Sequence, residues 1–273
     1  MSQESLTIAL IGEVFFDADG EARLSARLAE AKSRGAELVL LPELALDSWV
    51  PATQEVRDAD AEKPDGPRHR TLARAARSAG IGVVGGAIIR DPATGRRHNT
   101  ALVFDASGDL VAAYRKVHLP EEDGFWETSH HVPGDRPPEV IRAFGMPVGV
   151  QICSDANRPE GSHLLGAMGA EAVLLPRATE AGSWERWKLV LRANAVTSTA
   201  YVLSVNRRDP IAIPLGGPSI AIDPHGRVVA ESLDPMVVVT LSRAVVEEAR
   251  HVYPGYMPFR AGLYADVWRI LSS

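Results

Sequence analysis

Residues 37–42 read ELVLLP, and residues 171–176 read EAVLLP, almost the same sequence. Each stretch is a short apolar run that ends at a proline, Pro42 or Pro176, which cannot continue a central strand. Unbroken apolar runs of this length are typical of strands that are buried on both faces. A strand buried in this way needs other layers packed on it, so the two runs predict an α/β fold.

Segments typical of strands and of helices alternate outward from these two runs, and two more segments have the pattern of β-hairpins. Because strand–helix–strand units are mixed with hairpins, the sheet should be mixed rather than purely parallel. The expected strands are 6–14, 37–42, 81–90, 146–153, 171–176, 201–206 and 236–241, with hairpins at 100–117 and 218–232. The expected helices are about 19–35, 69–80, 159–168, 183–200 and 242–251.

No Ser/Gly-rich linker or run of charges divides the chain, so we expect a single domain over residues 1–273. A C-terminal arm should begin at about residue 252, because the tail from Tyr253 is rich in Tyr, Pro, Phe and Trp. We expect this arm to pack on its own body. Packing on a second subunit is the alternative.

The composition excludes several classes of protein. The chain has 273 residues, of which 45% are hydrophobic and 23% charged, so a folded globular protein is expected. Its net charge is −6 and its Lys and Arg are scattered, which argues against a nucleic-acid partner. No apolar run has the length of a membrane span, and the first residues lack the pattern of a signal peptide. A single cysteine cannot form an internal disulfide, so a cytoplasmic location is expected.

Two motifs fail in their context. The stretch GIGVVG (80–85) matches the dinucleotide-binding pattern, but a helix precedes it and a strand follows, the reverse of what such a site needs. His130 and His131 are adjacent in a polar stretch, where a solvated loop is expected rather than a metal pair. The sequence therefore predicts neither a cofactor nor a metal.

Three chemically competent residues follow expected strands: Glu43 in LVLLPEL, Lys116 in AAYRKVHLP and Cys153 in GVQICSD. In α/β folds, sites form at the carboxyl ends of strands. A carboxylate with a pKa raised by burial can take the proton of a thiol, and a lysine can stabilise the resulting oxyanion. Together, the three would make an acyl-transfer site that needs no metal.

Each residue alone has a simpler interpretation. A lone cysteine is most often a small buried hydrophobe, so Cys153 could be inert packing. Glu43 and Lys116 could be solvated surface residues. The residues by themselves do not place the three side chains together.

Three separated motifs nevertheless occur in one order along the chain: GAELVLLPEL (35–44), YRKVHLP (114–120) and GVQICSDANRPE (149–160). With them, the chain resembles the nitrilase superfamily of carbon–nitrogen hydrolases. Supporting matches are FWETSHHVPGD (125–135), AVLLPRA (172–178) and GPSIAIDPHGRVVAE (217–231). The resemblance covers nearly the whole chain.

The resemblance implies a four-layer αββα sandwich of two mixed β-sheets, and a homodimer or higher homo-oligomer. It implies Cys153 as nucleophile, Glu43 as general base and Lys116 as oxyanion stabiliser. A second glutamate is also implied between the lysine and cysteine motifs. Glu127 in FWETSHHVPG is the candidate, and Glu121 and Glu122 are its rivals.

Departures from the superfamily pattern concern the substrate. True nitrilases tend to have Cys-Trp-Glu at the nucleophile, whereas this chain has Cys153, Ser154 and Asp155, similar to the amidase and carbamoylase branches. Many members of those branches have an arginine four residues after the cysteine. Here that position is Asn157, followed by Arg158, so a carboxylate-binding role at this position is open.

The expected function is hydrolysis of a non-peptide C–N bond in a small-molecule amide or N-carbamoyl substrate, through a cysteine thioester. Trp49, Trp126 and Asn157 are the candidate pocket-lining residues, and the Ser154 backbone N–H is a candidate oxyanion donor. Two alternatives remain. One is nitrile hydrolysis by the same residues, and the other is a non-catalytic binding member of the superfamily.

Overall fold

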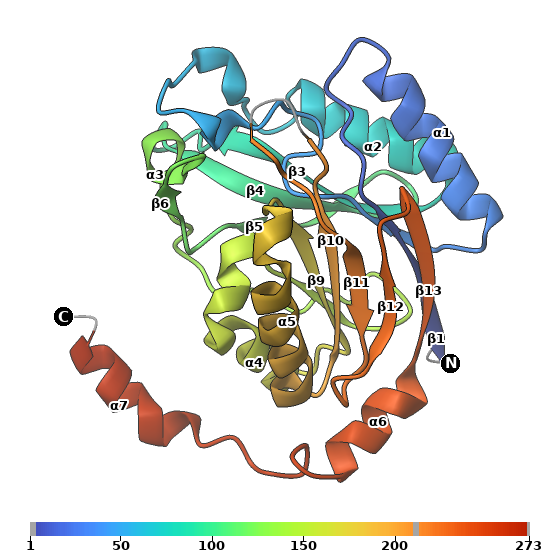
Figure 1. Ribbon diagram of the computed structural model, residues 1–273, viewed down its shortest axis with the longest axis vertical. Coiled ribbons are helices and arrows are strands. Elements are labelled where there is room, and N and C mark those ends of the chain that lie inside the picture. The colour runs from blue at the N-terminus through green and yellow to red at the C-terminus, as the bar shows by residue number, and fades with distance from the viewer. Residues whose placement is uncertain (1–3, 210–212, 272–273) are drawn as a thin grey trace.

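The computed structural model describes residues 4–209 and 213–271 of the chain. A six-stranded sheet contains both parallel and antiparallel neighbours, in the order β13-β1-β2-β3-β4-β5 (Figure 1). Its strands are β1 (Ser5–Ile11), β2 (Leu38–Leu40), β3 (Gly82–Arg90), β4 (Arg97–Phe104), β5 (Leu110–Arg115) and β13 (Met236–Ser242).

A five-stranded sheet has the order β12-β11-β10-β9-β8 and is also mixed. Its strands are β8 (Val148–Val150), β9 (Ala172–Arg177), β10 (Tyr201–Asn206), β11 (Ser219–Ile222) and β12 (Val228–Ser232). The two proline-ended apolar runs form β2 and β9, one in each sheet. Each lies between parallel neighbours, as their unbroken apolar character predicts.

The two sheets pack face to face with helices outside, which gives the four-layer αββα sandwich (Figure 1). Alternation along β1 shows how one strand serves two layers. Ile8 and Leu10 belong to the core shared with the other sheet, whereas Ala9 and Ile11 pack with Leu24 of the outer helix α1. The expected fold class is therefore confirmed.

Helices cover the outer face of each sheet. The helices α1 (Gly20–Ser33) and α2 (Pro67–Ala79) cover the six-stranded sheet. The helices α4 (Pro159–Ala167) and α5 (Trp184–Ser198) cover the five-stranded sheet and pack against each other. Shorter elements complete the body: η1 (Val50–Ala52), η2 (Asp58–Asp60), β6 (Glu121–Glu122), β7 (Phe125–Trp126), α3 (Glu127–His130), η3 (Cys153–Asn157) and η4 (Ala181–Ser183).

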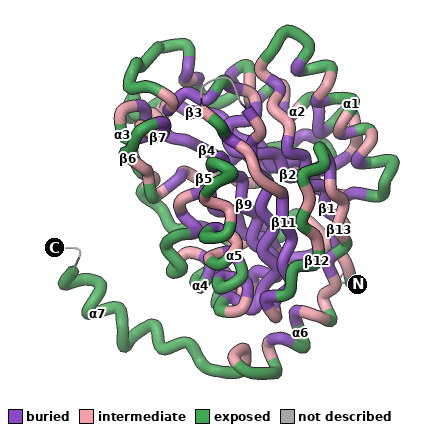
Figure 2. The backbone as a smooth tube through the Cα atoms, viewed as in Figure 1, coloured by how far each residue is buried: buried purple, intermediate pink, exposed green. Residues whose placement is uncertain are grey.

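The C-terminal segment leaves the body. After α6 (Arg243–His251) the chain extends to α7 (Ala261–Leu271), whose side chains are all exposed (Figure 2). Phe259 meets the ring of His163 edge-on, with 4.7 Å between ring centroids. The expected packing of this arm on its own body is therefore wrong for α7, because its apolar side chains find no cover there. Within residues 4–209 and 213–271, no helix has both the length and the apolar character that crossing a bilayer demands.

Candidate active site

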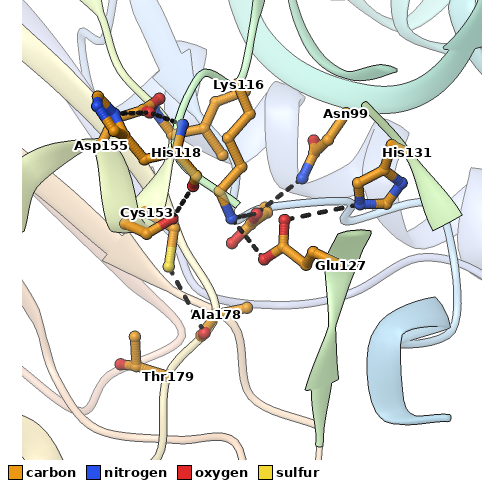
Figure 3. A network of polar contacts seen from close by, with 12 residues as sticks. Asn99, Lys116, His118, Glu127, His131, Cys153, Asp155, Ala178 and Thr179 are labelled. Atoms are coloured by element: carbon orange, nitrogen blue, oxygen red, sulfur yellow. Dashed lines mark hydrogen bonds and ion pairs between the residues drawn. The ribbon is translucent and has the colours of Figure 1, made fainter. Parts of the chain in front are cut away.

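The strand-end residues Glu43, Lys116 and Cys153 come together in one site. Figure 3 shows Lys116 and Cys153 with the residues around them. Glu43 follows β2 and Lys116 follows β5, so both come from the six-stranded sheet. Cys153 follows β8 of the five-stranded sheet. Three segments that are far apart in the sequence thus place a carboxylate, an ammonium and a thiol in one site.

Lys116 lies at the centre of a buried ionic cluster. Its Nζ is 2.8 Å from Oε1 of Glu43 and 2.5 Å from Oε1 of Glu127. The Glu43 Oε1 atom also accepts a hydrogen bond of 2.8 Å from the Asn99 amide. Lys116 and Glu127 are fully buried, and Glu43 is 2% exposed. Buried charges are tolerated only when they are paired, and these groups pair with one another.

The electrostatics of this cluster distinguish its members. Burial raises the pKa of Glu43 to about 7, and the Glu127 charge adds to the rise against the lowering effect of Lys116. Burial alone would lower the pKa of Lys116, but the Glu127 and Glu43 carboxylates outweigh it and raise the pKa above its ordinary value. Lys116 therefore stays charged near neutral pH, whereas Glu43 can exchange a proton there.

Glu127 is the glutamate that contacts the lysine. Burial alone would raise its pKa, but Lys116 and then His131 hold the pKa below its ordinary value. The two alternative candidates from the sequence, Glu121 and Glu122, are exposed on β6. Among the described residues, Lys116 donates to Glu127 and to neither of these two glutamates. The structure thus brings Glu127, rather than either rival, into the cluster.

The expectation that His130 and His131 form a solvated loop is wrong, because both are buried. His131 Nε2 lies 3.6 Å from the free Oε2 of Glu127, and burial lowers the pKa of His131 (Figure 3). The Nε2 atom of His130 faces the backbone carbonyl of Thr53 at 2.6 Å. His130 ends the short helix α3 and His131 is its C-cap, and the two side chains have different partners. The polar residues around them in the sequence gave no indication of this burial.

Cys153 is the first residue of the 3-10 helix η3 and has a backbone φ of 45°, a value that residues other than glycine rarely adopt. This turn aims the thiol into the site, where its Sγ lies 3.7 Å from the backbone carbonyl of Ala178. Burial, and then the Glu43 charge, raise the pKa of the thiol. The resting cysteine is therefore a thiol that needs a base beside it.

Asp155 joins the cysteine turn to the lysine strand, a role that the sequence reasoning missed. Its Oδ2 accepts hydrogen bonds from the Ile152 N–H at 3.0 Å and the Tyr114 hydroxyl at 2.9 Å. Its Oδ1 accepts from the N–H groups of Val117 at 3.2 Å and His118 at 2.9 Å. A single buried carboxylate thus fixes the positions of both segments.

A pocket of about 360 Å³ opens onto the thiol, a volume typical of small-molecule sites. The candidates Ser154 and Asn157 line it, and so does Trp187, which the sequence reasoning did not single out. The lining residues are Pro120, Glu122, Phe125, Cys153, Ser154, Asn157, Ala178, Thr179, Glu180, Ser183, Arg186 and Trp187.

The structure does not bring Trp49 and Trp126 into this lining set. Trp49 is buried behind the hairpin of β6 and β7, where its indole N–H donates to the Gly124 carbonyl at 2.9 Å. Its ring packs edge-on against Phe125, with 5.9 Å between centroids. Trp126 lies in β7, paired with Glu121. An aromatic residue near a motif is as suited to supporting a loop as to meeting a substrate.

Over the described residues 4–209 and 213–271, no three His, Cys, Asp or Glu side chains are grouped to hold a metal ion.

The chain matches the family "Carbon-nitrogen hydrolase" over residues 14–251. It belongs to that family. The match spans all the segments that build the ionic cluster and the cysteine turn.

Relatives of this carbon–nitrogen hydrolase carry names of related activities. It is 31% identical to "Omega-amidase NIT3" of Saccharomyces cerevisiae, over 85% of this chain and 83% of that protein. It is 26% identical to "Citrullinase" of Francisella tularensis, over 97% of this chain and 99% of that protein. The solved structure of S. cerevisiae Nit3, a nitrilase superfamily member, superposes with a TM-score of 0.77 at 27% identity, covering 94% and 97% of the two chains. The resemblance to this superfamily and the amidase-type enzyme class are thereby confirmed.

Proposed function

We propose that this carbon–nitrogen hydrolase cleaves a small amide or N-carbamoyl compound through a thioester on Cys153. The observation that carries the proposal is the buried ammonium of Lys116 between two carboxylates, beside a thiol that opens onto a pocket. This arrangement supplies a nucleophile, a base and a cation for the developing oxyanion. No metal or cofactor takes part in the proposed route.

The first half of the reaction forms the thioester. Glu43 Oε2, which accepts no N–H or O–H bond from the described residues, takes the proton of the Cys153 thiol. The thiolate attacks the carbonyl carbon, and the C–O π electrons move onto oxygen. Lys116 Nζ and the Ser154 backbone N–H hold this oxyanion. As the C–N bond breaks, protonated Glu43 returns its proton to the departing nitrogen, and ammonia or an amine leaves.

The second half regenerates the enzyme. Glu43, again a carboxylate, removes a proton from water as the water attacks the thioester carbon. The C–S bond breaks, the sulfur takes the proton back from Glu43, and the carboxylic or carbamic acid leaves. Glu127 stays ionised throughout and holds Lys116 in place from the other side. Ser154 and Asn157 contact the substrate within the pocket, whereas Trp49 and Trp126 support the surrounding loops.

The decisive experiment compares the parent protein with a Cys153→Ala variant on a panel of primary amides and N-carbamoyl compounds. We expect the variant to lose about 10³-fold or more in kcat, because one member of an interdependent set is removed. Mass spectrometry of the parent protein with a slow substrate should detect an acyl group on Cys153. Retained turnover by the variant would rule out the thiol mechanism.

Nitrile hydrolysis by the same residues is the competing function. The omega-amidase and citrullinase names of the relatives favour amide and carbamoyl chemistry. Matched nitrile and amide substrates distinguish the two, and acid release from the nitrile alone would reverse the preference. A non-catalytic binding role is the remaining alternative. It would be favoured if Cys153 reacted with iodoacetamide no faster than a free thiol and nothing in the panel turned over.

We also propose that the chain forms a homodimer or higher homo-oligomer through its C-terminal arm. Supporting this, α7 exposes a set of large apolar side chains: Leu263, Tyr264, Val267, Trp268, Ile270 and Leu271. Exposed apolar surface of this kind marks a protein contact. The proposed location is the cytoplasm, where a reducing environment would preserve the free Cys153 thiol.

A further inference from the structure

Three charged side chains line the pocket, and they carry both signs. Arg186 lies in the first turn of α5, Glu180 precedes η4, and Glu122 comes from the hairpin strand β6. The structure gives none of the three side chains a hydrogen bond or ion pair with another described residue. By contrast, the exposed Arg74 pairs with Glu21 at 2.7 Å. The charges of the pocket are thus available to a bound molecule.

A fourth charge lies directly behind the pocket wall. Arg177, at the end of β9, is fully buried, and its hydrogen bonds go to neutral groups. One of these, 2.6 Å long, holds the hydroxyl of Thr179, and the guanidinium also lies 5.7 Å from the ring centre of Trp187. Both Thr179 and Trp187 line the pocket. Among the described residues, no carboxylate forms an ion pair with Arg177.

A buried cation without a counter-ion is costly, and burial lowers the pKa of Arg177 to about 10. Because Arg177 is itself buried and contacts Thr179 and Trp187, its positive charge is less screened than that of a surface arginine and acts on the pocket beside it. This field adds to the charge of Arg186, which belongs to the same wall. The α5 side of the pocket therefore attracts an anionic group, while the glutamates offer sites for a cationic one.

Resting on the proposed function, we propose that the substrate is a small zwitterion. Its scissile amide or carbamoyl group meets Cys153, and its other end carries a carboxylate and an ammonium group. Arg186 binds the carboxylate, favoured by the field of Arg177, and Glu122 and Glu180 bind the ammonium. The pocket volume of about 360 Å³ suits a molecule of amino-acid size.

Four matched amides test the proposal by removing one charge at a time. L-Glutamine has both charges, glutaramate lacks the ammonium, 4-aminobutanamide lacks the carboxylate, and butanamide lacks both. L-Citrulline provides a carbamoyl zwitterion of greater length. We expect kcat/KM for at least one zwitterion to exceed that for butanamide by about ten-fold or more, because charge-assisted hydrogen bonds contribute that much.

Two variants assign the charges. Arg186→Gln should reduce the zwitterion-to-butanamide ratio of kcat/KM by about ten-fold, since one charge-assisted contact is lost. Glu122→Gln should reduce the glutamine-to-glutaramate ratio instead. Arg158→Gln is the matched control, because Arg158 is an exposed arginine directly after the cysteine turn η3 and does not line the pocket. This variant should keep both ratios of kcat/KM. Circular dichroism spectra should match the parent for all three variants.

The outcomes separate this proposal from the function on which it rests. If the kcat/KM for butanamide equals that for both zwitterions, the proposed zwitterionic substrate is wrong, although the proposed amidase function is retained. If glutaramate is preferred to both zwitterions, the ammonium site is wrong. If Arg186→Gln keeps its ratio, the carboxylate assignment is wrong. If no compound in these series or in the wider amide and carbamoyl panel is hydrolysed, the proposed function fails, and the substrate proposal fails with it.

Discussion

Glu43 and Glu127 bind the same ammonium, yet their other contacts differ, and these contacts divide their roles. Asn99 donates to the oxygen of Glu43 that already meets Lys116, which leaves the second oxygen for the thiol. Glu127 instead has His131 near its second oxygen. These contacts support the proposal that Glu43 exchanges a proton while Glu127 remains charged.

The proton-exchanging role predicts a pH dependence. Because the pKa of Glu43 is raised to about 7, the group is mostly protonated below that pH and cannot take the thiol proton. We expect kcat/KM to rise with pH through about 7, with an acid limb of unit slope. Rates measured from pH 5 to 9 check this. A profile that stays flat down to pH 5 would contradict Glu43 as the base.

The position of His131 predicts a second effect at this scale. His131→Leu removes the imidazole whose Nε2 lies 3.6 Å from Oε2 of Glu127. We expect kcat to fall about five-fold with little change in KM, since a contact of this kind contributes on the order of 1 kcal/mol. His131→Gln, which keeps an N–H donor, should recover most of the lost kcat.

Equal losses in both His131 variants would show a purely structural role for this residue. Unfolding curves for the two variants separate that possibility from instability. A Leu variant with the kcat of the parent would show that Lys116 alone keeps Glu127 charged.

At the scale of elements, the site depends on the hydrogen bonds that connect the cysteine turn η3 to the residues after β5 of the other sheet. The helix η3 and the residues that follow β5 belong to different sheets, and Asp155 connects them by hydrogen bonds to backbone N–H groups. A shift between the sheets would separate Lys116 from Cys153. The connection therefore sets the geometry of the proposed oxyanion site.

Asp155→Ala should lower the free energy of unfolding by about 3 kcal/mol, because several N–H groups lose their acceptor in a buried site. The fall in kcat should exceed what this loss of stability explains. Urea unfolding and kinetics of the same preparation measure both effects. Asp123→Ala, at an exposed position of the nearby hairpin, is the control and should change neither.

The sequence predicted elements better than it predicted side-chain surroundings, and particular residues show why. The apolar runs of β2 and β9 are determined by burial on both faces, which composition alone reveals. The burial of His131 and the tie made by Asp155 depend on contacts between segments far apart in the chain. Local polarity therefore suggested a solvated loop for the first and gave no signal for the second.

At the scale of the whole molecule, the unexpected feature is the exposure of the C-terminal arm. The composition of this segment predicts a separate tail, but the surface on which the tail packs depends on contacts that the local sequence does not contain. The exposed helix α7 projects from the sandwich with its apolar side chains uncovered, whereas α1, α2, α4 and α5 each cover a sheet (Figure 2). The apolar side chains of the sandwich are thus buried between its layers, whereas those of α7 are exposed.

The arm predicts the assembly. A chain ending at Pro258 removes α7 and should sediment as a smaller species than the full chain, because the exposed apolar surface of the helix is lost. Ile270→Asp in the full chain should weaken the same association, since it places a charge in the contact. Analytical ultracentrifugation measures both. A full-length protein that remains a monomer at micromolar concentration would contradict the proposed oligomer.

The one cysteine of the chain gives a practical means of counting. Because Cys153 is the only thiol and lies at the pocket, every equivalent of a small thiol reagent that binds reports on that site alone. The labelled fraction of a preparation therefore equals the fraction of chains whose proposed nucleophile is accessible and unoxidised. A spectroscopic probe can likewise be attached at the bottom of the pocket without first removing any other cysteine.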